Sequence, residues 1–198
     1  MQLRRYLLIP RSVCALAVAL LAVGCTVQPT AGTPPPTDFN ATDTAWIQLM
    51  IPMDERARLL TDLAPSRQGD PAVAALAAET ARRLREDLVR LRALLKRSEV
   101  PDTRPHEGHD MPGMVSLDTL AKAGSTTGAA FDRILTEALR AHLTQSRMLC
   151  AGERTQGRAA EAKELATAIA QSTAGQISRL GRLRPPEPAV SSGAGRRP

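Results

Sequence analysis

The sequence predicts an all-α fold in which four helices pack as an antiparallel bundle. Strand signals are weak, because the 198-residue chain has two Phe, one Tyr and one Trp and no run in which β-branched and polar residues alternate. Apolar residues instead recur at spacings of three and four in four stretches, as they do in amphipathic helices. Two of these stretches repeat the other two at a fixed offset. Together they predict a single bundle domain over residues 38–184.

The first predicted hairpin covers residues 38–97. Its first helix begins near Thr42 and carries on one face Trp46, Leu49, Met53, Leu60 and Leu63. The start of its second helix is indicated by Asp70 and Pro71, because Asp favours the N-cap position and Pro the first turn. The apolar stripe of that second helix consists of Val73, Leu76, Thr80, Leu84, Leu88, Leu91 and Leu95.

A connection over residues 98–125 leads to the second predicted hairpin, residues 126–184. Its first helix begins near Thr127, with inward positions at Phe131, Leu135, Ala138, His142, Gln145 and Leu149. Its second helix has its stripe at Leu165, Ile169, Thr173, Ile177 and Leu180. Both helices show the 3.6-residue period of an element that buries one face.

The second hairpin repeats the first when the sequence is shifted by 89 residues without a gap. Identical residues then coincide at Asp43 and Asp132, Arg58 and Arg147, Leu76 and Leu165, and Arg90 and Arg179. Two hairpins with apolar faces bury them by packing together, which predicts the bundle. The shift also aligns Met53 with His142. Both lie on apolar stripes, and this fits either a buried ligand pair or two ordinary core residues.

The N-terminal segment has the organisation of an export signal. Basic residues precede an apolar run over residues 13–23 that is too short to span a bilayer. The following residues resemble the bacterial lipobox, in which Cys25 receives a diacylglycerol after removal of residues 1–24. The alternative is an ordinary signal peptide cut near Gly24. Residues 25–37 and 185–198 are rich in Pro, Gly, Ser and Thr, which predicts a flexible tether and a disordered tail.

The expected location is therefore the outer face of the cytoplasmic membrane, with the chain held there by its lipid. A diacylglycerol and a further acyl chain give stable anchoring. The net charge is +6, but acidic and basic residues alternate along the second helix, so nucleic-acid binding is not expected. Cys150 is the remaining cysteine of the expected mature domain besides Cys25, and we expect it to be buried and inert, the alternative being a reactive or metal-binding thiol.

Two segments resemble a known family. The segment DFNATDTAWIQLMIPMDERA is similar to the start of the ferritin-like domain-of-unknown-function family 305, and HEGHDMPGMVSLDTLAKAGSTTGAAFDRIL is similar to its central part. The resemblance covers residues 38–183. It implies a ferritin-like four-helix bundle in an exported, often copper-associated protein, with paired His and Met side chains facing inward. It implies no general enzymatic activity.

The sequence departs from the family pattern at most of the inward ligand positions. The His-His pair of the family is Met53-Asp54 here, and in the second hairpin His142 is followed by Leu143. Other family polar and Met positions are occupied by Leu84, Asp87, Thr173, Gln176, Leu60, Leu91, Leu149 and Leu180. The departures imply a divergent member that keeps the fold and has lost most of the core site.

The nine residues HEGHDMPGM, positions 106–114, form the main candidate site. His106 and His109 can reach one ion if the backbone turns at Gly108, and Met111 and Met114 add soft thioethers suited to Cu(I). The alternative is a structural connector, with a type II turn at Pro112-Gly113 and methionines that plug the bundle. Copper is thus the expected metal, if any, with His142 and Met53 as further candidate ligands.

Two functions remain open from the sequence. One is copper binding or buffering by a membrane-anchored lipoprotein, and the other is a metal-independent scaffold or interaction domain of the cell envelope. An enzyme is not expected. Di-iron chemistry requires Glu-x-x-His on facing helices, and Ser-His-Asp hydrolysis of the common hydrolase type requires Gly-x-Ser-x-Gly; the sequence has neither motif.

Overall fold

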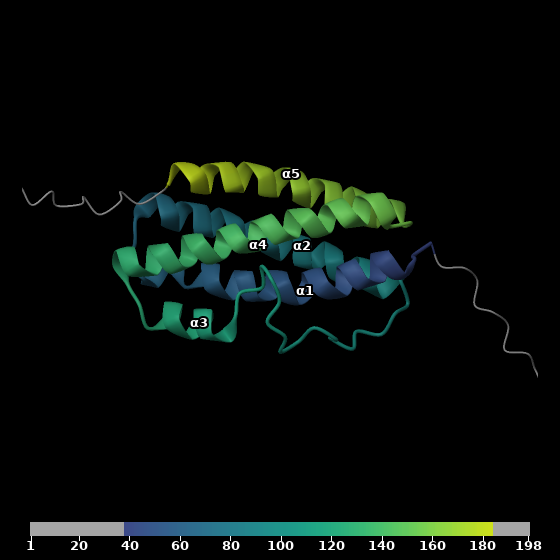
Figure 1. Ribbon diagram of the computed structural model, residues 1–198, viewed down its shortest axis with the longest axis horizontal. Helices are drawn as coiled ribbons and strands as arrows, with labels where there is room; N and C mark the ends of the chain where they lie inside the picture. Colours follow the sequence, from purple (N-terminus) through teal and green to yellow (C-terminus); the bar gives the residue numbers. More distant parts are fainter. Residues whose placement is uncertain (1–37, 184–198) are drawn as a thin grey trace, which may run out of the picture. The chain divides into compact units, whose positions relative to one another are not determined.

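The computed structural model describes residues 38–183, and all regular elements in that range are helices (Figure 1). The long helices are α1 (Ala41–Asp62), α2 (Pro71–Arg97), α4 (Gly128–Gln156) and α5 (Ala160–Arg182). A short helix α3 (Leu117–Gly124) and a 3₁₀ turn η1 (Ala64–Ser66) lie between them. The all-α prediction is confirmed. The expectations for residues 1–24, Cys25, the tether and the tail concern residues outside the described range.

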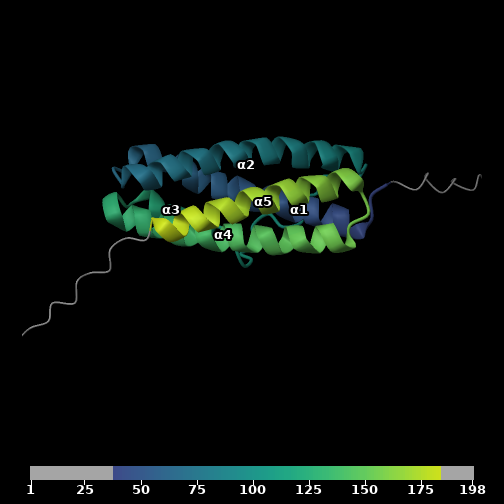
Figure 2. The same cartoon turned by 90° about the horizontal axis from the view of Figure 1, so that it is seen from above.

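The long helices contact one another in a closed order. α1 packs against α2 and α4, and α5 packs against α4 and α2. Figure 2 shows α5 between α2 and α4 when the molecule is seen from above. The short α3 lies against α4 and α1, on the side of the domain away from α5 (Figure 1). None of the helices within residues 38–183 combines the length and apolar character needed to cross a lipid bilayer.

The starts of the first two long helices are set by capping side chains. Asn40 accepts a hydrogen bond from the backbone N–H of Asp43, and Asp43 accepts one from the N–H of Asn40, which forms a capping box. Asp70 accepts from the N–H groups of Ala72 and Val73, with Pro71 in the first turn. The predicted N-cap of α2 is confirmed. Such caps stabilise a helix by about 1 kcal/mol each.

The apolar core has two halves with a polar layer between them. One half contains Trp46, Ile47, Met50, Leu91, Cys150 and Leu165, and the other contains Leu60, Leu76, Phe131, Leu135, Leu139 and Leu180. Along α1 the first half ends at Ile51 and the second begins at Ala57. The buried residues Asp54, His142 and Thr173 lie between the halves. The middle of the domain is therefore more polar than its two ends.

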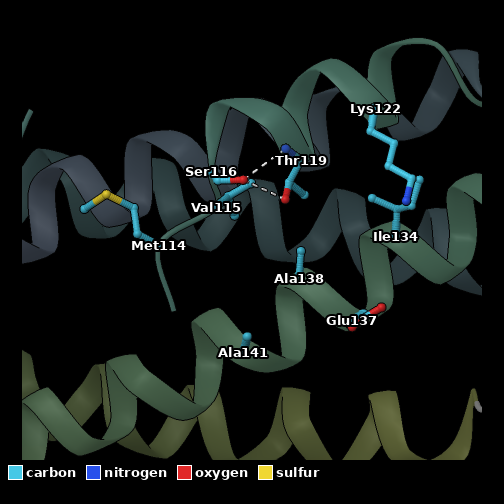
Figure 3. A pocket seen from close by; sticks show the side chains of 9 residues that line it. All are labelled: Met114, Val115, Ser116, Thr119, Lys122, Ile134, Glu137, Ala138 and Ala141. Atoms are coloured by element: carbon cyan, nitrogen blue, oxygen red, sulfur yellow. Dashed lines mark hydrogen bonds between the residues drawn. The ribbon is translucent and has the colours of Figure 1, made fainter. Parts of the chain in front are cut away.

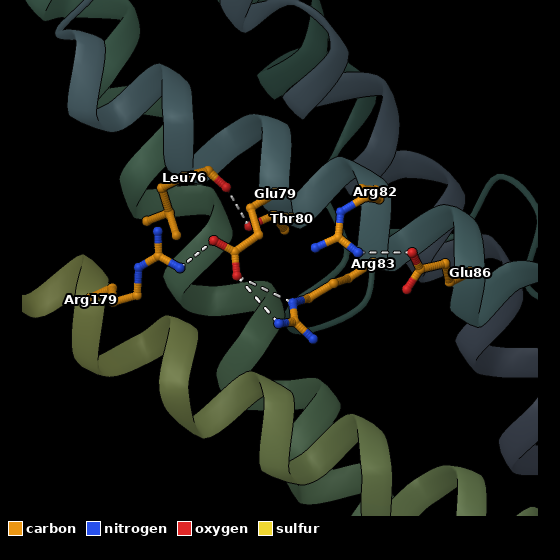
Figure 4. Close-up of polar contacts among 7 residues, drawn as sticks. All are labelled: Leu76, Glu79, Thr80, Arg82, Arg83, Glu86 and Arg179. Carbon is orange, nitrogen blue, oxygen red and sulfur yellow. Dashed lines mark hydrogen bonds and ion pairs between the residues drawn. The ribbon is translucent and has the colours of Figure 1, made fainter.

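Most of the arginines on the surface of α2 are paired with carboxylates. Glu79 bonds to Arg83 one turn away and to Arg179 of α5, and Arg82 bonds to Glu86 (Figure 4). Arg85 pairs with Asp62 of α1 at 3.2 Å. Each exposed pair contributes about 0.2–1 kcal/mol. The pairing offsets the positive charge of Arg82, Arg83 and Arg85 on this face.

The connection between the hairpins is tied to α1 at several points. Arg104 bonds to Glu55 at 2.7 Å, and the buried Arg56 reaches Asp110 at 3.1 Å. Gln48 donates to the carbonyl of Pro101 at 3.3 Å. The segment over residues 98–116 is therefore held along the surface of the helices, and this fixes the position of the candidate loop.

Candidate functional site

The segment HEGHDMPGM folds as two consecutive tight turns. The N–H of His109 donates to the carbonyl of His106 at 3.3 Å, with Gly108 at φ +83°. The N–H of Met114 donates to the carbonyl of Met111 at 2.9 Å, with Gly113 at φ +77°. A positive φ at the third turn residue is the feature of type II turns that selects glycine. The expected turns at Gly108 and at Pro112-Gly113 are both present.

The first turn brings the two imidazoles together. The ring centroids of His106 and His109 lie 6.2 Å apart with an interplanar angle of 66°, an edge-to-face arrangement. His106 is half-buried and His109 is exposed. Metal–imidazole bonds are about 2.0–2.1 Å long, so rings this close can both reach one ion after small side-chain rotations. The geometry thus fits the predicted pairing of these two residues.

The acidic residues of the loop are already engaged by arginine. Glu107 bonds to Arg104 at 2.7 Å, and Asp110 bonds to Arg56 at 3.1 Å. These ion pairs direct both carboxylates away from the role of metal ligand. The donors that remain in the loop are imidazole nitrogens and thioether sulfurs, a set that favours soft or borderline ions over Mg²⁺ or Ca²⁺.

The two loop methionines do not share the environment of the histidines. Met114 is buried, 8% exposed, and lines a cavity of about 370 Å³ between α3 and α4 (Figure 3). Met111 is half-buried. A Cβ added at Gly113 would overlap the Gln145 side chain of α4, so this turn packs directly on the helix. Met114 is thus part of the protein interior beside this cavity, which is compatible with the connector interpretation.

A methionine from α4 lies near the histidines instead. His106 and Met148 line one groove of about 520 Å³, whose walls are residues of α1 and α4. Met148 is 64% exposed, in contrast to the buried Met50, Met53 and Met114. This residue was not predicted from the sequence. The sequence feature that could have indicated it is an apolar side chain that follows Arg147 and lies outside the buried stripe of α4.

In the core, the partner of His142 is Asp54. The imidazole Nε2 lies 3.4 Å from the Asp54 carboxyl group and 3.5 Å from the Ser146 hydroxyl, and both Asp54 and His142 are almost fully buried. Burial raises the pKa of Asp54, and the hydrogen bond with His142 opposes this rise. The Nδ1 atom of His142 finds no hydrogen-bond partner within residues 38–183. Met53, the predicted companion of His142, is buried one residue before Asp54.

All four long helices contribute polar groups around this pair. A small cavity of about 20 Å³ is bordered by Asp54, His142, Asp87, Thr80, Thr173 and Gln176. Its volume suits a single water molecule. Burial, and then repulsion from Asp54, raise the pKa of Asp87 to about 7. The core nevertheless keeps a polar layer at this level, in which Asp54 of α1 is the partner of His142.

The polar layer does not amount to a metal centre built from the usual ligands. Within residues 38–183 no three side chains of His, Cys, Asp or Glu converge so that they could hold a metal ion. The Asp54–His142 pair already satisfies its members in part, and its cavity has no room for a hydrated ion. The surface turn, with its histidines and nearby thioethers, is the better candidate.

A second buried acidic pair lies near the start of α1. The Asp43 carboxylate accepts from the N–H groups of Asn40, Arg158 and Ala159. Burial opposes ionisation of Asp43, but these hydrogen bonds prevail and lower its pKa. Burial, together with Asp43, raises the pKa of Glu153 to about 8. Neither oxygen of Glu153 receives a donor from another described residue, so the protonated form of Glu153 is favoured at neutral pH.

Cys150 is fully buried and unpaired. Burial raises the pKa of its thiol to about 12, with repulsion from Asp54 as the next contribution. A thiolate is therefore disfavoured at neutral pH, and the thiol is a poor nucleophile and metal ligand. The geometry agrees with the expectation of an inert core cysteine.

The comparisons with known proteins come from a family model and from solved structures. The model of the Domain of unknown function (DUF305) matches residues 43–184. The fold is similar to that of a DUF305 protein from Streptomyces coelicolor that is named as a secreted protein, with a TM-score of 0.66 and 18% identity over 75% of this chain and 93% of that chain.

A DUF305 fragment from Deinococcus radiodurans also matches, with a TM-score of 0.66 and 19% identity over 75% of this chain and 97% of that chain. At these identities the likeness to solved structures establishes the fold alone. No curated protein matches the sequence.

Proposed function

The chain belongs to the DUF305 family, and we propose that it is an exported domain that binds a soft metal ion, copper in particular, at the His106–His109 turn. The observation that carries this proposal is the approach of the two imidazole rings to 6.2 Å on the surface. The ion pairs of Glu107 and Asp110 support it, because they leave nitrogen and sulfur as the free donors of the loop.

The preference for copper rests on the chemistry of these donors. Imidazole suits both oxidation states of copper, and thioether sulfur suits Cu(I). An exposed turn is accessible to ions outside the domain, whereas the Asp54–His142 pair is buried. A bound metal ion would add positive charge at the His106–His109 turn. The chain supplies the positions of the two rings through the turn at Gly108.

We further propose that the domain acts as a membrane-anchored binding module. The lipobox at Cys25 supports lipid anchoring on the outer face of the cytoplasmic membrane, and the secreted Streptomyces relative supports export. The closed contact order of α1, α2, α5 and α4 supports an antiparallel four-helix bundle of ferritin-like type. The paired arginines of α2 support a function without nucleic acid. We assign binding and not catalysis.

The test is a titration of residues 26–198 with Cu(I) against a competing chelator. This segment omits Cys14 and Cys25 and contains all of the described residues 38–183, which belong to one compact unit. We expect about one ion per chain with a Kd tighter than micromolar, and loss of binding in His106→Ala/His109→Ala with the melting temperature of the metal-free protein unchanged. Glu107→Gln, in the same turn, is the matched control and should bind as the wild type does.

Absence of binding above the chelator background would exclude the metal site. The remaining function would then be the metal-independent scaffold or interaction domain, whose partner should be retained after chelation. Binding that survives the double histidine change would place the site elsewhere and would also contradict the proposal.

A further inference from the structure

We propose that Met148 of α4 is the thioether ligand of the metal site at the His106–His109 turn. This inference rests on the proposed function and names a ligand that lies outside the loop. It replaces Met114, which belongs to the loop motif by sequence. The site would then be formed by two segments, the connection between the hairpins and helix α4.

The first argument is shared location. His106 and Met148 line the same groove, together with Trp46 and Leu49 of α1 and Leu149 of α4. His109 lies edge-to-face against His106, so all three side chains gather at one side of the domain. The other groove residues of α1 and α4 near them are mainly apolar, so few oxygen ligands compete with nitrogen and sulfur.

The second argument is the exposure of Met148. It is 64% exposed, whereas Met50, Met53 and Met114 are at most 8% exposed. An exposed Met loses the packing contacts that justify a large apolar side chain and keeps its sulfur available. Its side chain has three rotatable bonds, so its sulfur can take up many positions in the groove without a change of the backbone.

The third argument excludes Met114 as that ligand. Met114 lines the cavity between α3 and α4 together with Val115 and Ile134, whereas His106 lines a different groove (Figure 3). Bringing its sulfur to His106 would empty that cavity wall and disturb a turn that packs on Gln145. Met111 is half-buried, and its methyl resonance shows whether it binds the ion instead of Met148.

The structure offers a matched substitution for Met148. The 89-residue shift aligns Met148 with Leu59 of α1, which is also exposed. Met148→Leu therefore places at this site the residue that the equivalent position already carries. It removes the sulfur and keeps the apolar volume, so the fold should be unaffected.

The experiment uses residues 26–198 with ¹³C-methyl methionine and Ag(I), a redox-inert probe that resembles Cu(I). We expect the methyl resonance of Met148 to shift on titration while those of Met50, Met53 and Met114 stay in place. Met148→Leu should lower the affinity for Ag(I) and Cu(I) at least about tenfold, in line with the cost of weakening a metal site. Affinity for Cu(II) should change little, because thioethers favour Cu(I). Met114→Leu is the control and should bind as the wild type does.

The outcomes separate the two proposals. If the double histidine variant loses Ag(I) binding but Met148→Leu keeps it, or if the methyl group of Met111 shifts instead, the metal function stands and the assignment of Met148 is wrong. If the wild-type chain binds neither Ag(I) nor Cu(I), both proposals are wrong. A shift of Met148 that persists in the double histidine variant would show an independent thioether contact, and this too would overturn the shared site.

Discussion

Asp43 and Asp132, which are 89 residues apart in the sequence, perform the same structural task in opposite hairpins. Asp43 at the start of α1 accepts a hydrogen bond from the N–H of Ala159 at 3.0 Å, and Ala159 is the N-cap of α5. Asp132 near the start of α4 accepts one from the N–H of Asp70 at 2.7 Å, and Asp70 is the N-cap of α2. Residues 70 and 159 are also 89 apart. The first helix of each hairpin thus binds the N-cap residue of the second helix in the other hairpin.

Removal of either carboxylate is expected to destabilise the whole domain. Asp43→Ala and Asp132→Ala each leave backbone N–H groups unpaired at a helix start, at a cost of about 1–3 kcal/mol. Asp43→Ala should cost more, because Asp43 is fully buried and accepts from three residues. Denaturant unfolding followed by circular dichroism measures the change. Asp62→Ala, which removes exposed ion pairs, is the control and should cost less than about 1 kcal/mol. Equal small effects at all three positions would contradict this prediction.

The raised pKa of Glu153 predicts that stability falls as pH increases. The folded state holds the proton of Glu153 up to a pKa of about 8, while the unfolded chain releases it near 4.5. The stabilisation from neutral Glu153 is therefore fully present below about pH 4.5 and is lost as pH rises through 8. The slope reaches at most about 1.4 kcal/mol per pH unit.

Glu153→Gln should reduce this dependence, because the amide stays neutral over the whole range. Asp87, with a pKa of about 7, contributes in the same direction between pH 4 and 7, and Asp87→Asn tests its share. The measurement is the free energy of unfolding at intervals from pH 5 to 8.5. A wild-type stability that is constant over this range would contradict the prediction.

The Asp54–His142 pair should show strong coupling. His142→Met leaves a buried carboxyl without its imidazole, and Asp54→Leu leaves the imidazole without its carboxyl; each change should cost about 3–5 kcal/mol. These replacements are the residues at the equivalent positions, Met53 and Leu143. The double variant should recover most of the loss, because a buried pair replaced by apolar residues is often neutral or stabilising. Additive losses in a double-mutant cycle would show that the two residues do not interact.

Cys150 is expected to be unreactive in the folded protein. Its thiol is fully buried, and its pKa is raised to about 12 by burial. With residues 26–198 at pH 8, an aromatic disulfide reagent should modify the thiol only as fast as the domain unfolds, and should modify it at once in denaturant. Rapid stoichiometric reaction under native conditions would show that the thiol is accessible.

Gly108→Ala is expected to weaken the metal site through the backbone. Nothing lies within 4 Å of a Cβ added at Gly108, so the change creates no clash, but φ of +83° is unfavourable for alanine. The strain of about 1–2 kcal/mol should shift the turn toward other conformations and reduce copper affinity several-fold. Gly175→Ala, in open space within α5, is the control and should leave affinity unchanged and stabilise the helix slightly.

The sequence was sufficient for the helices but not for the partners of the site residues. The N-cap at Asp70 and the stripe of α2 follow local rules, and the structure has them as expected. The contact of His142 with Asp54 was not predicted, because Asp54 lies on α1 and the contact depends on how α1 and α4 pack. Met148 was missed for a similar reason. Its nearness to His106 depends on the path of the connection along α1, which ion pairs at Glu55 and Arg56 determine.

The reciprocal carboxylates also explain how one half of a duplicated protein can diverge in chemistry. In a homodimer of identical hairpins, every ionisable group placed in the interior would occur twice. Here the two halves share one chain, and the second buries His142, Cys150 and Glu153 where the first has Met53, Thr61 and Ala64. Asp43 and Asp132 keep the halves equivalent in architecture while their interiors differ. The residues that maintain the shared architecture are therefore different from the residues that place titratable groups in each interior.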